Sequence, residues 1–142
     1  MICQLDLTDR DTIARLKRFS ILDHPSTFRY FKNRVFEDAI KTHKLTLLYT
    51  LDTVDVGYAH IDVDTKTNRA YFGICILPDY QSKGIGKIMV DYIFKQYTDI
   101  VYLTVDNTNI PAINLYKQFG FSLVENNGTS GLWCRSAIGT SP

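Results

Sequence analysis

The most informative stretch of the sequence is Gln81-Ser82-Lys83-Gly84-Ile85-Gly86-Lys87. An apolar run that ends at Pro78 precedes it and an amphipathic stretch that begins at Ile88 follows it, which indicates a strand, a glycine loop and a helix. The two glycines let the backbone turn sharply and approach a ligand closely, while the unpaired N–H groups of the first helical turn point at that ligand. The stretch therefore predicts an anion-binding loop, and a diphosphate fits it best.

Two common nucleotide motifs do not fit this loop. An ATPase-type phosphate loop needs a glycine at the position of Gln81 and a serine or threonine at that of Ile88. A dinucleotide fingerprint needs a third glycine at the position of Met89 and an acidic residue about twenty residues later, and neither part is convincing. The loop therefore indicates neither ATP nor a dinucleotide.

The pattern Gln-x-x-Gly-x-Gly between a strand and a helix resembles the acetyl-coenzyme A loop of the GNAT superfamily of N-acetyltransferases. A second region, with residues 101–105, Asn109-Ile110-Pro111-Ala112 and residues 115–121, resembles the strand, helix and Gly-Phe turn that follow the loop in that superfamily. The resemblance is sharpest over residues 71–121. It implies an α/β fold with a mixed, mostly antiparallel, twisted sheet of about seven strands, helices on both faces, and strands splayed at the cofactor site.

Length and composition agree with one enzyme domain. The chain has 142 residues, and we expect a single domain over residues 1–137, followed at 138–142 by a flexible tail or the start of a linker to a further C-terminal domain. A net charge of +1 gives no reason to expect a nucleic acid or an anionic membrane as partner. Three cysteines without CxxC spacing indicate no metal site and a reducing, cytoplasmic location, and the first residues lack the apolar core of a secretion signal or membrane span.

Hydrophobic periodicity and turn residues predict the remaining elements. They are a strand near residues 2–7, a helix over 9–19 capped by Thr8, a second helical stretch containing Phe28, Phe31, Val35, Phe36 and Ile40, strands over 44–51, 56–63 and 70–77, a helix over 87–97, and then a strand, a helix and two strands near 122–125 and 132–136. A meander followed by helical crossovers gives a mixed sheet.

The resemblance also assigns the cofactor, acetyl-coenzyme A, to particular residues. The loop would hold its pyrophosphate through Gln81, Ser82, Lys83, Gly84, Ile85, Gly86 and Lys87. The pantetheine arm would pair with the main chain of Ile74, Cys75 and Ile76, and the Ile76 N–H would polarise the thioester carbonyl, a role worth about 3 kcal/mol. Both isoleucine side chains also suit a core. Asn109 either caps a helix or contacts the cofactor.

Catalysis needs an acid for the leaving thiolate and a base for the amine. By resemblance, Tyr116 protonates the thiolate. Residues 70–77 lack the glutamate that many relatives carry on this strand, and Gly73 stands in its interior. His60 and Asp62 alternate along the preceding strand and face the same side of the sheet, so either is a candidate base, directly or through water. His24 and His43 are the other titrating candidates. A histidine in a strand also serves as a structural hydrogen-bonding residue.

The acceptor site is expected in the aromatic and cationic segment between residues 24 and 36. Its proposed binding residues are His24, Phe28, Tyr30 and Phe31, with Arg29, Lys32 and Arg34 beside them. Aromatic faces next to cations suit a sugar ring linked to a nucleotide diphosphate, and residues 57–62 are similar in style to small GNAT enzymes that acetylate amino sugars. The plain alternative is that the aromatic side chains belong to the hydrophobic core and the cationic side chains are merely solvated.

The expected function is therefore direct transfer of an acetyl group to a primary amine, with a nucleotide-linked amino sugar as the first candidate. The absent carboxylate favours an amine of low pKa, because a lysine-like amine at pH 7 costs about 4.6 kcal/mol to deprotonate and an α-amine about 1.4. Acetylation of a protein N-terminus or another small amine is the nearest alternative, and a catalytically silent acyl-coenzyme A binding module is an alternative of another class. The sequence leaves a homodimer open.

Overall fold

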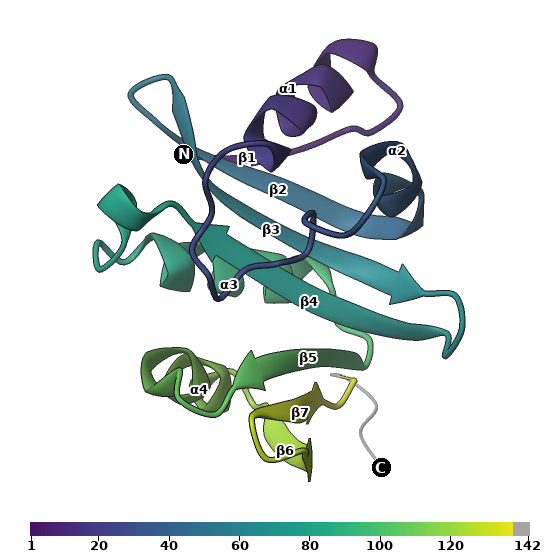
Figure 1. Cartoon of the computed structure of the whole chain (residues 1–142), viewed down its shortest axis with the longest axis vertical. Coiled ribbons are helices and arrows are strands. Elements are labelled where there is room, and N and C mark those ends of the chain that lie inside the picture. The colour runs from purple at the N-terminus through teal and green to yellow at the C-terminus, as the bar shows by residue number, and fades with distance from the viewer. Residues whose placement is uncertain (138–142) are drawn as a thin grey trace.

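The computed structural model describes residues 1–137 and shows a seven-stranded sheet in the order β1-β2-β3-β4-β5-β7-β6, with helices on both faces (Figure 1). In chain order the elements are β1 (Ile2–Gln4), α1 (Arg10–Ser20), α2 (Phe36–Ala39), η1 (Ile40–Thr42), β2 (His43–Leu51), β3 (Val54–Asp64), β4 (Arg69–Ile76), η2 (Pro78–Tyr80), α3 (Ile85–Gln96), β5 (Val101–Asp106), α4 (Ile110–Gln118), β6 (Ser122–Asn126) and β7 (Ser130–Arg135). Neighbouring strands are antiparallel except β4 and β5, which are parallel. The predicted mixed, mostly antiparallel α/β sheet is confirmed.

The side chains of β3 point alternately to the two faces of the sheet. Ala59 and Ile61 are fully buried in the larger core, which contains the inner residues of α3 and Tyr116 from α4. Tyr58 points to the other face and packs with Leu16 and other residues of the α1 side. Because side chains alternate along a strand, His60 and Asp62 lie on the same face as Tyr58, where both contact Tyr30 of the segment that joins α1 to α2.

The sheet opens between β4 and β5. All eight residues of β4 pair with β3, but the parallel register with β5 is limited to Tyr71 opposite Tyr102. The Leu77 N–H donates to the Val56 carbonyl at 2.9 Å, on the β3 side. Backbone groups alternate in direction along a strand, so Ile74 and Ile76 direct theirs toward the open side. The predicted splay is therefore present.

The predicted second helix is largely wrong. Residues 25–34 form short turns with N–H to carbonyl bonds such as Phe28 to Pro25, Lys32 to Arg29 and Arg34 to Phe31, and α2 has only four residues. In this segment tertiary packing of the aromatic rings outweighs helical periodicity.

The cap of α1 is Asp9 rather than the predicted Thr8. The Asp9 carboxylate accepts from the N–H and hydroxyl of Thr12 at 3.0 and 2.7 Å. Thr8 instead bonds to Asp6.

No helix within residues 1–137 is long and apolar enough to cross a membrane. The tail predicted at residues 138–142 lies outside the described part of the chain.

Candidate active site

The glycine loop leads directly into α3. Gly84 caps the helix with a φ of +83°, in the left-handed region that favours glycine, and the Ile85 side chain is buried in the core. The first backbone bond here runs from the Ile88 N–H to the Gly84 carbonyl at 3.2 Å. The N–H groups of the first helical turn are thus available to an anion. Gln81 Nε2 donates to the Ile76 carbonyl at 3.1 Å, which ties the loop to the open edge of β4.

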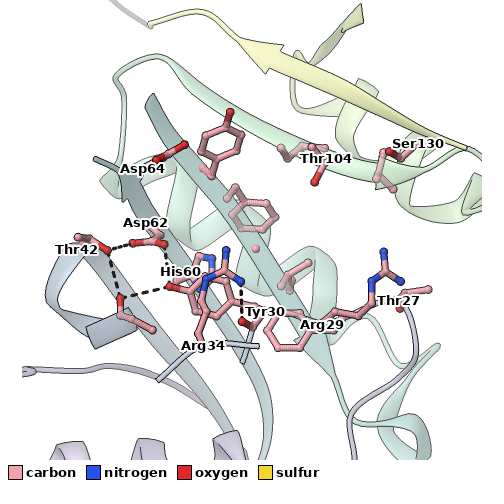
Figure 2. Close-up of a pocket in the computed structure, with 18 of the residues that line it drawn as sticks. Thr27, Arg29, Tyr30, Arg34, Thr42, His60, Asp62, Asp64, Thr104 and Ser130 are labelled. Carbon is pink, nitrogen blue, oxygen red and sulfur yellow. Dashed lines mark hydrogen bonds between the residues drawn. The ribbon is translucent and has the colours of Figure 1, made fainter. Parts of the chain in front are cut away.

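A cavity of about 800 Å³ lies where β4 and β5 separate. Its walls are β3 and β4, β5 with the start of α4, and parts of the segment 27–42. Figure 2 shows His60, Asp62 and Tyr30 together in this cavity, with Thr104 and Ser130 on the far side. The cavity therefore joins the open strand edge to the face that carries the candidate bases.

Tyr116 enters the cavity wall from α4. The ring is 7% exposed and packs against Phe72 and Phe121, with ring centroids 6.0 and 5.8 Å away. Its hydroxyl makes no hydrogen bond within residues 1–137, and burial raises the pKa of the phenol above its ordinary value. The group therefore stays protonated and able to donate a proton.

His60 is nearly buried, at 3% exposure, and lies opposite Gly73 in the β3–β4 register. Its Nδ1 is 2.6 Å from the Tyr58 hydroxyl. A Cβ added at Gly73 would lie 2.6 Å from His60 Nε2, so the glycine leaves the space that the imidazole needs. Burial, followed by the charges of His43 and Arg34, lowers the pKa of His60 well below its ordinary value.

Asp62 belongs to a network with Tyr30, His43 and Thr42. Its carboxylate accepts from the Tyr30 hydroxyl at 2.8 Å and from the Thr42 hydroxyl. The Tyr30 oxygen is also 3.1 Å from His43 Nε2, and because the phenol proton goes to Asp62, this nitrogen is the donor. Burial lowers the pKa of His43 to about 4, although Asp62 opposes this shift. Burial and the bond to Asp62 raise the pKa of Tyr30.

Carboxylates outnumber cations among the described residues of the cavity wall. The charged residues are Asp38, Asp62, Asp64, Asp106, Arg29 and Arg34. Arg29 pairs with Asp106 at 3.4 Å, and Arg34 donates to the Tyr30 carbonyl at 2.7 Å and stacks over the Tyr30 ring at 4.2 Å. Both arginines are thus partly engaged by the protein itself.

The structure divides the expected acceptor residues into two pairs. Phe28 and Tyr30 line the cavity. His24 bonds to the Phe19 carbonyl at 2.9 Å, and Phe31 packs against Phe36 and Tyr58, so both lie on the α1 side and are not among the described residues of the cavity wall. The Phe28 ring also packs against the core of the α1 side.

The cofactor residues are also distributed unevenly. The Ile74 and Ile76 backbones face the open edge, whereas the Cys75 side chain is buried in the α1-side core, where burial raises its pKa to about 12. Asn109 caps α4 by accepting from the Ala112 N–H at 3.4 Å and also lines the cavity. Within residues 1–137, no group of three or more His, Cys, Asp or Glu side chains is placed to hold a metal ion.

The sequence analysis missed Tyr58, Thr42 and Asp106. Tyr58 was detectable, because it stands two residues before His60 and therefore shares its face. Thr42 and Asp106 reach the site only through the packing of η1 and β5.

The fold is thus a mixed α/β sheet with a splayed strand pair, a cavity beside this pair and a glycine loop at a helix start. Residues 12–121 match the model of the Acetyltransferase (GNAT) family, and the chain belongs to this family.

Three known proteins are similar to this chain in sequence or in fold. An N-alpha-acetyltransferase of Sulfurisphaera tokodaii is 26% identical over 136 residues, covering 84% of this chain and 78% of that protein. An uncharacterized N-acetyltransferase, ycf52, of Gracilaria tenuistipitata var. liui is 32% identical over 80 residues, covering 55% of this chain but only 43% of its own length. The structure of a GNAT superfamily phosphinothricin acetyltransferase from Sinorhizobium meliloti, in complex with AcCoA, has a TM-score of 0.70 and 15% identity, covering 100% of this chain and 92% of that chain. None of these three names refers to an amino sugar.

Proposed function

We propose that the protein transfers the acetyl group of acetyl-coenzyme A directly to a primary amine held in the cavity. The observation that carries the proposal is a cavity that reaches both the open edge of β4 and the Tyr116 side chain, in a chain that also has a free first turn at α3. Acetyl-coenzyme A supplies an activated acyl group as a thioester.

The chain's own residues take the following roles. The amides from Lys83 to Lys87 bind the pyrophosphate, and the backbone groups of Ile74 and Ile76 bind the pantetheine arm. The Ile76 N–H stabilises negative charge on the carbonyl oxygen. As the amine nitrogen forms its bond to the carbonyl carbon and the carbon–sulfur bond breaks, Tyr116 donates its proton to the departing thiolate.

The amine must also lose a proton. His60 and Asp62, which line the cavity together with Val63 and Asp64 of the same strand, are the two proposed acceptors of that proton, directly or through water. The network from Tyr30 and Thr42 holds the Asp62 carboxylate in place.

The charge of the cavity wall limits which acceptor can bind. An amino sugar fits beside the Phe28 and Tyr30 rings, but its nucleotide-linked form would bring a diphosphate into a wall with four carboxylates and only two arginines. The likeness to an N-alpha-acetyltransferase favours an α-amine, which is also an amine of low pKa. We therefore propose an amine of low pKa, either in an amino sugar without the nucleotide or at the N-terminus of a peptide.

The test measures thiol release from acetyl-coenzyme A with purified protein and a panel of free and nucleotide-linked amino sugars, amino acid amides, short peptides and polyamines. Amine-dependent release that falls at least tenfold in Tyr116→Phe, with acetyl-coenzyme A binding unchanged by calorimetry, is the expected result. Tight binding of acetyl-coenzyme A without turnover of any amine would instead favour the silent binding module. Absence of binding would reject both.

A further inference from the structure

The Tyr58 hydroxyl has only one hydrogen-bond partner within residues 1–137, and this partner is His60 Nδ1 at 2.6 Å. Tyr58 is fully buried, so water does not reach this hydroxyl. A buried phenol that does not donate its proton loses the free energy of a hydrogen bond. The Tyr58 O–H must therefore donate to Nδ1, which has to be the unprotonated nitrogen of the ring.

The tautomer of His60 follows from this bond. Burial lowers the pKa of His60, so the imidazole is neutral and carries one proton. Since Nδ1 accepts, this proton is on Nε2. His60 Nε2 makes no hydrogen bond to any described residue and faces Gly73. His60 and Gly73 both line the cavity. A nearly buried polar side chain thus directs an unused N–H donor into the acceptor cavity.

We propose that His60 donates a hydrogen bond to the acceptor, and that this bond goes to an oxygen atom on the carbon adjacent to the one that bears the reacting amine. The inference rests on the proposed function and narrows it. Tyr58 is the positioning residue, because its O–H fixes which imidazole nitrogen carries the proton. His60 in this tautomer has no lone pair facing the cavity, so it does not take the amine proton, and of the two proposed acceptors of that proton Asp62 remains.

The position of the donor selects the class of amine. Nε2 lies on the face of the sheet beneath residues 24–34, whereas the pantetheine arm is expected in the plane of the sheet along Ile74 and Ile76. The donor therefore meets the acceptor and not the thioester. Amino acids, peptide N-termini and 2-amino sugars carry an oxygen beside the amine, whereas a polyamine offers only ammonium donors.

The first test is nitrogen-15 NMR of histidine-labelled protein, which needs neither substrate nor turnover. The chain has three histidines, and the signals absent from His60→Leu identify His60. We expect a proton bonded to Nε2 and none on Nδ1 throughout the range from pH 6 to 8. Tyr58→Phe should remove this preference, since Nδ1 then has no donor. A wild-type His60 protonated on Nδ1, with Nε2 bare, would overturn the proposal.

The second test compares thiol release by wild type, His60→Leu and His60→Gln. Alaninamide and glucosamine offer a carbonyl and a hydroxyl oxygen respectively, and cyclohexylamine and spermidine offer none. We expect His60→Leu to lose about tenfold in kcat/KM with the oxygen-bearing amines only, and His60→Gln, which keeps an N–H donor, to lose less. An equal loss with all amines, or turnover confined to the oxygen-free amines, would refute the donor role. If wild type acetylates no amine, the proposed function fails, while the NMR result still decides the tautomer.

Discussion

Replacing Gly73 with alanine tests the closest contact in the site. The new Cβ would lie 2.6 Å from His60 Nε2 and 3.0 Å from Cε1. The His60 ring cannot turn away freely, because Tyr58 is hydrogen-bonded to its Nδ1 and the centroid of the Tyr30 ring lies 4.3 Å from the centroid of the imidazole. Overpacking costs about 1–3 kcal/mol, and weakening the buried Tyr58–His60 hydrogen bond costs about 1 kcal/mol more. We expect Gly73→Ala to lower the free energy of unfolding by about 2–4 kcal/mol.

Thermal and urea unfolding measure this change, and a loss of this size lowers the melting temperature by roughly 10 °C. The matched control is Gly86→Ala, since a Cβ there meets nothing closer than Ile76 Cγ1 at 4.0 Å and alanine favours a helix. The decisive comparison repeats Gly73→Ala in a His60→Ala background, where the contact no longer exists. A similar loss of stability in both backgrounds would show that the imidazole is not the cause.

Three further predictions concern the acid, the α1 cap and the buried histidines. Tyr116→Phe should keep the affinity for acetyl-coenzyme A and lower kcat at least tenfold, about 1.4 kcal/mol in the barrier, and an unchanged kcat in thiol-release assays would remove Tyr116 from the mechanism. Asp9→Ala should lower the free energy of unfolding by about 1 kcal/mol in urea titrations, whereas Thr8→Ala should change it much less, because only Asp9 accepts from the first turn of α1. Burial lowers the pKa of His43 to about 4 and that of His60 well below 6.5. The unfolded chain therefore binds protons that the native protein does not, and stability should fall as the pH decreases from about 6.5 toward 4. Urea unfolding across this range measures the effect, which should be smaller in His43→Gln; a flat profile would contradict the buried neutral state.

Local sequence signals predicted the strands and the longer helices. The turn at Asp52 and Thr53 is an example, because both residues adopt a positive φ between two alternating strands. The start of α3 followed from the glycine loop. The separation of β4 from β5 came from the family resemblance and not from periodicity, since hydrophobic patterns do not report which strands pair.

The sequence could not predict features that depend on tertiary contacts. Residues 25–34 have helical spacing of aromatic residues, yet they turn repeatedly because their rings pack against Tyr58 and Phe36. The sequence around Gly73 does not explain why a glycine stands inside this strand. The explanation is the His60 side chain, thirteen positions earlier in the sequence, which lies opposite Gly73 on the neighbouring strand. The tautomer of His60 likewise depends on a bond that only the folded chain forms.

The narrow contact between β4 and β5 also affects how the protein unfolds. The β5, β7 and β6 strands form one antiparallel block, and its register with the remaining sheet is limited to the Tyr71–Tyr102 pair. Without ligand, amide hydrogens of this block should exchange with solvent by opening events that leave β2 and β3 intact. A ligand that hydrogen-bonds to the backbone of Ile74 and Ile76 would fill the gap between this block and the rest of the sheet. With ligand bound, the block should then no longer open separately, and the whole sheet should unfold in one cooperative transition.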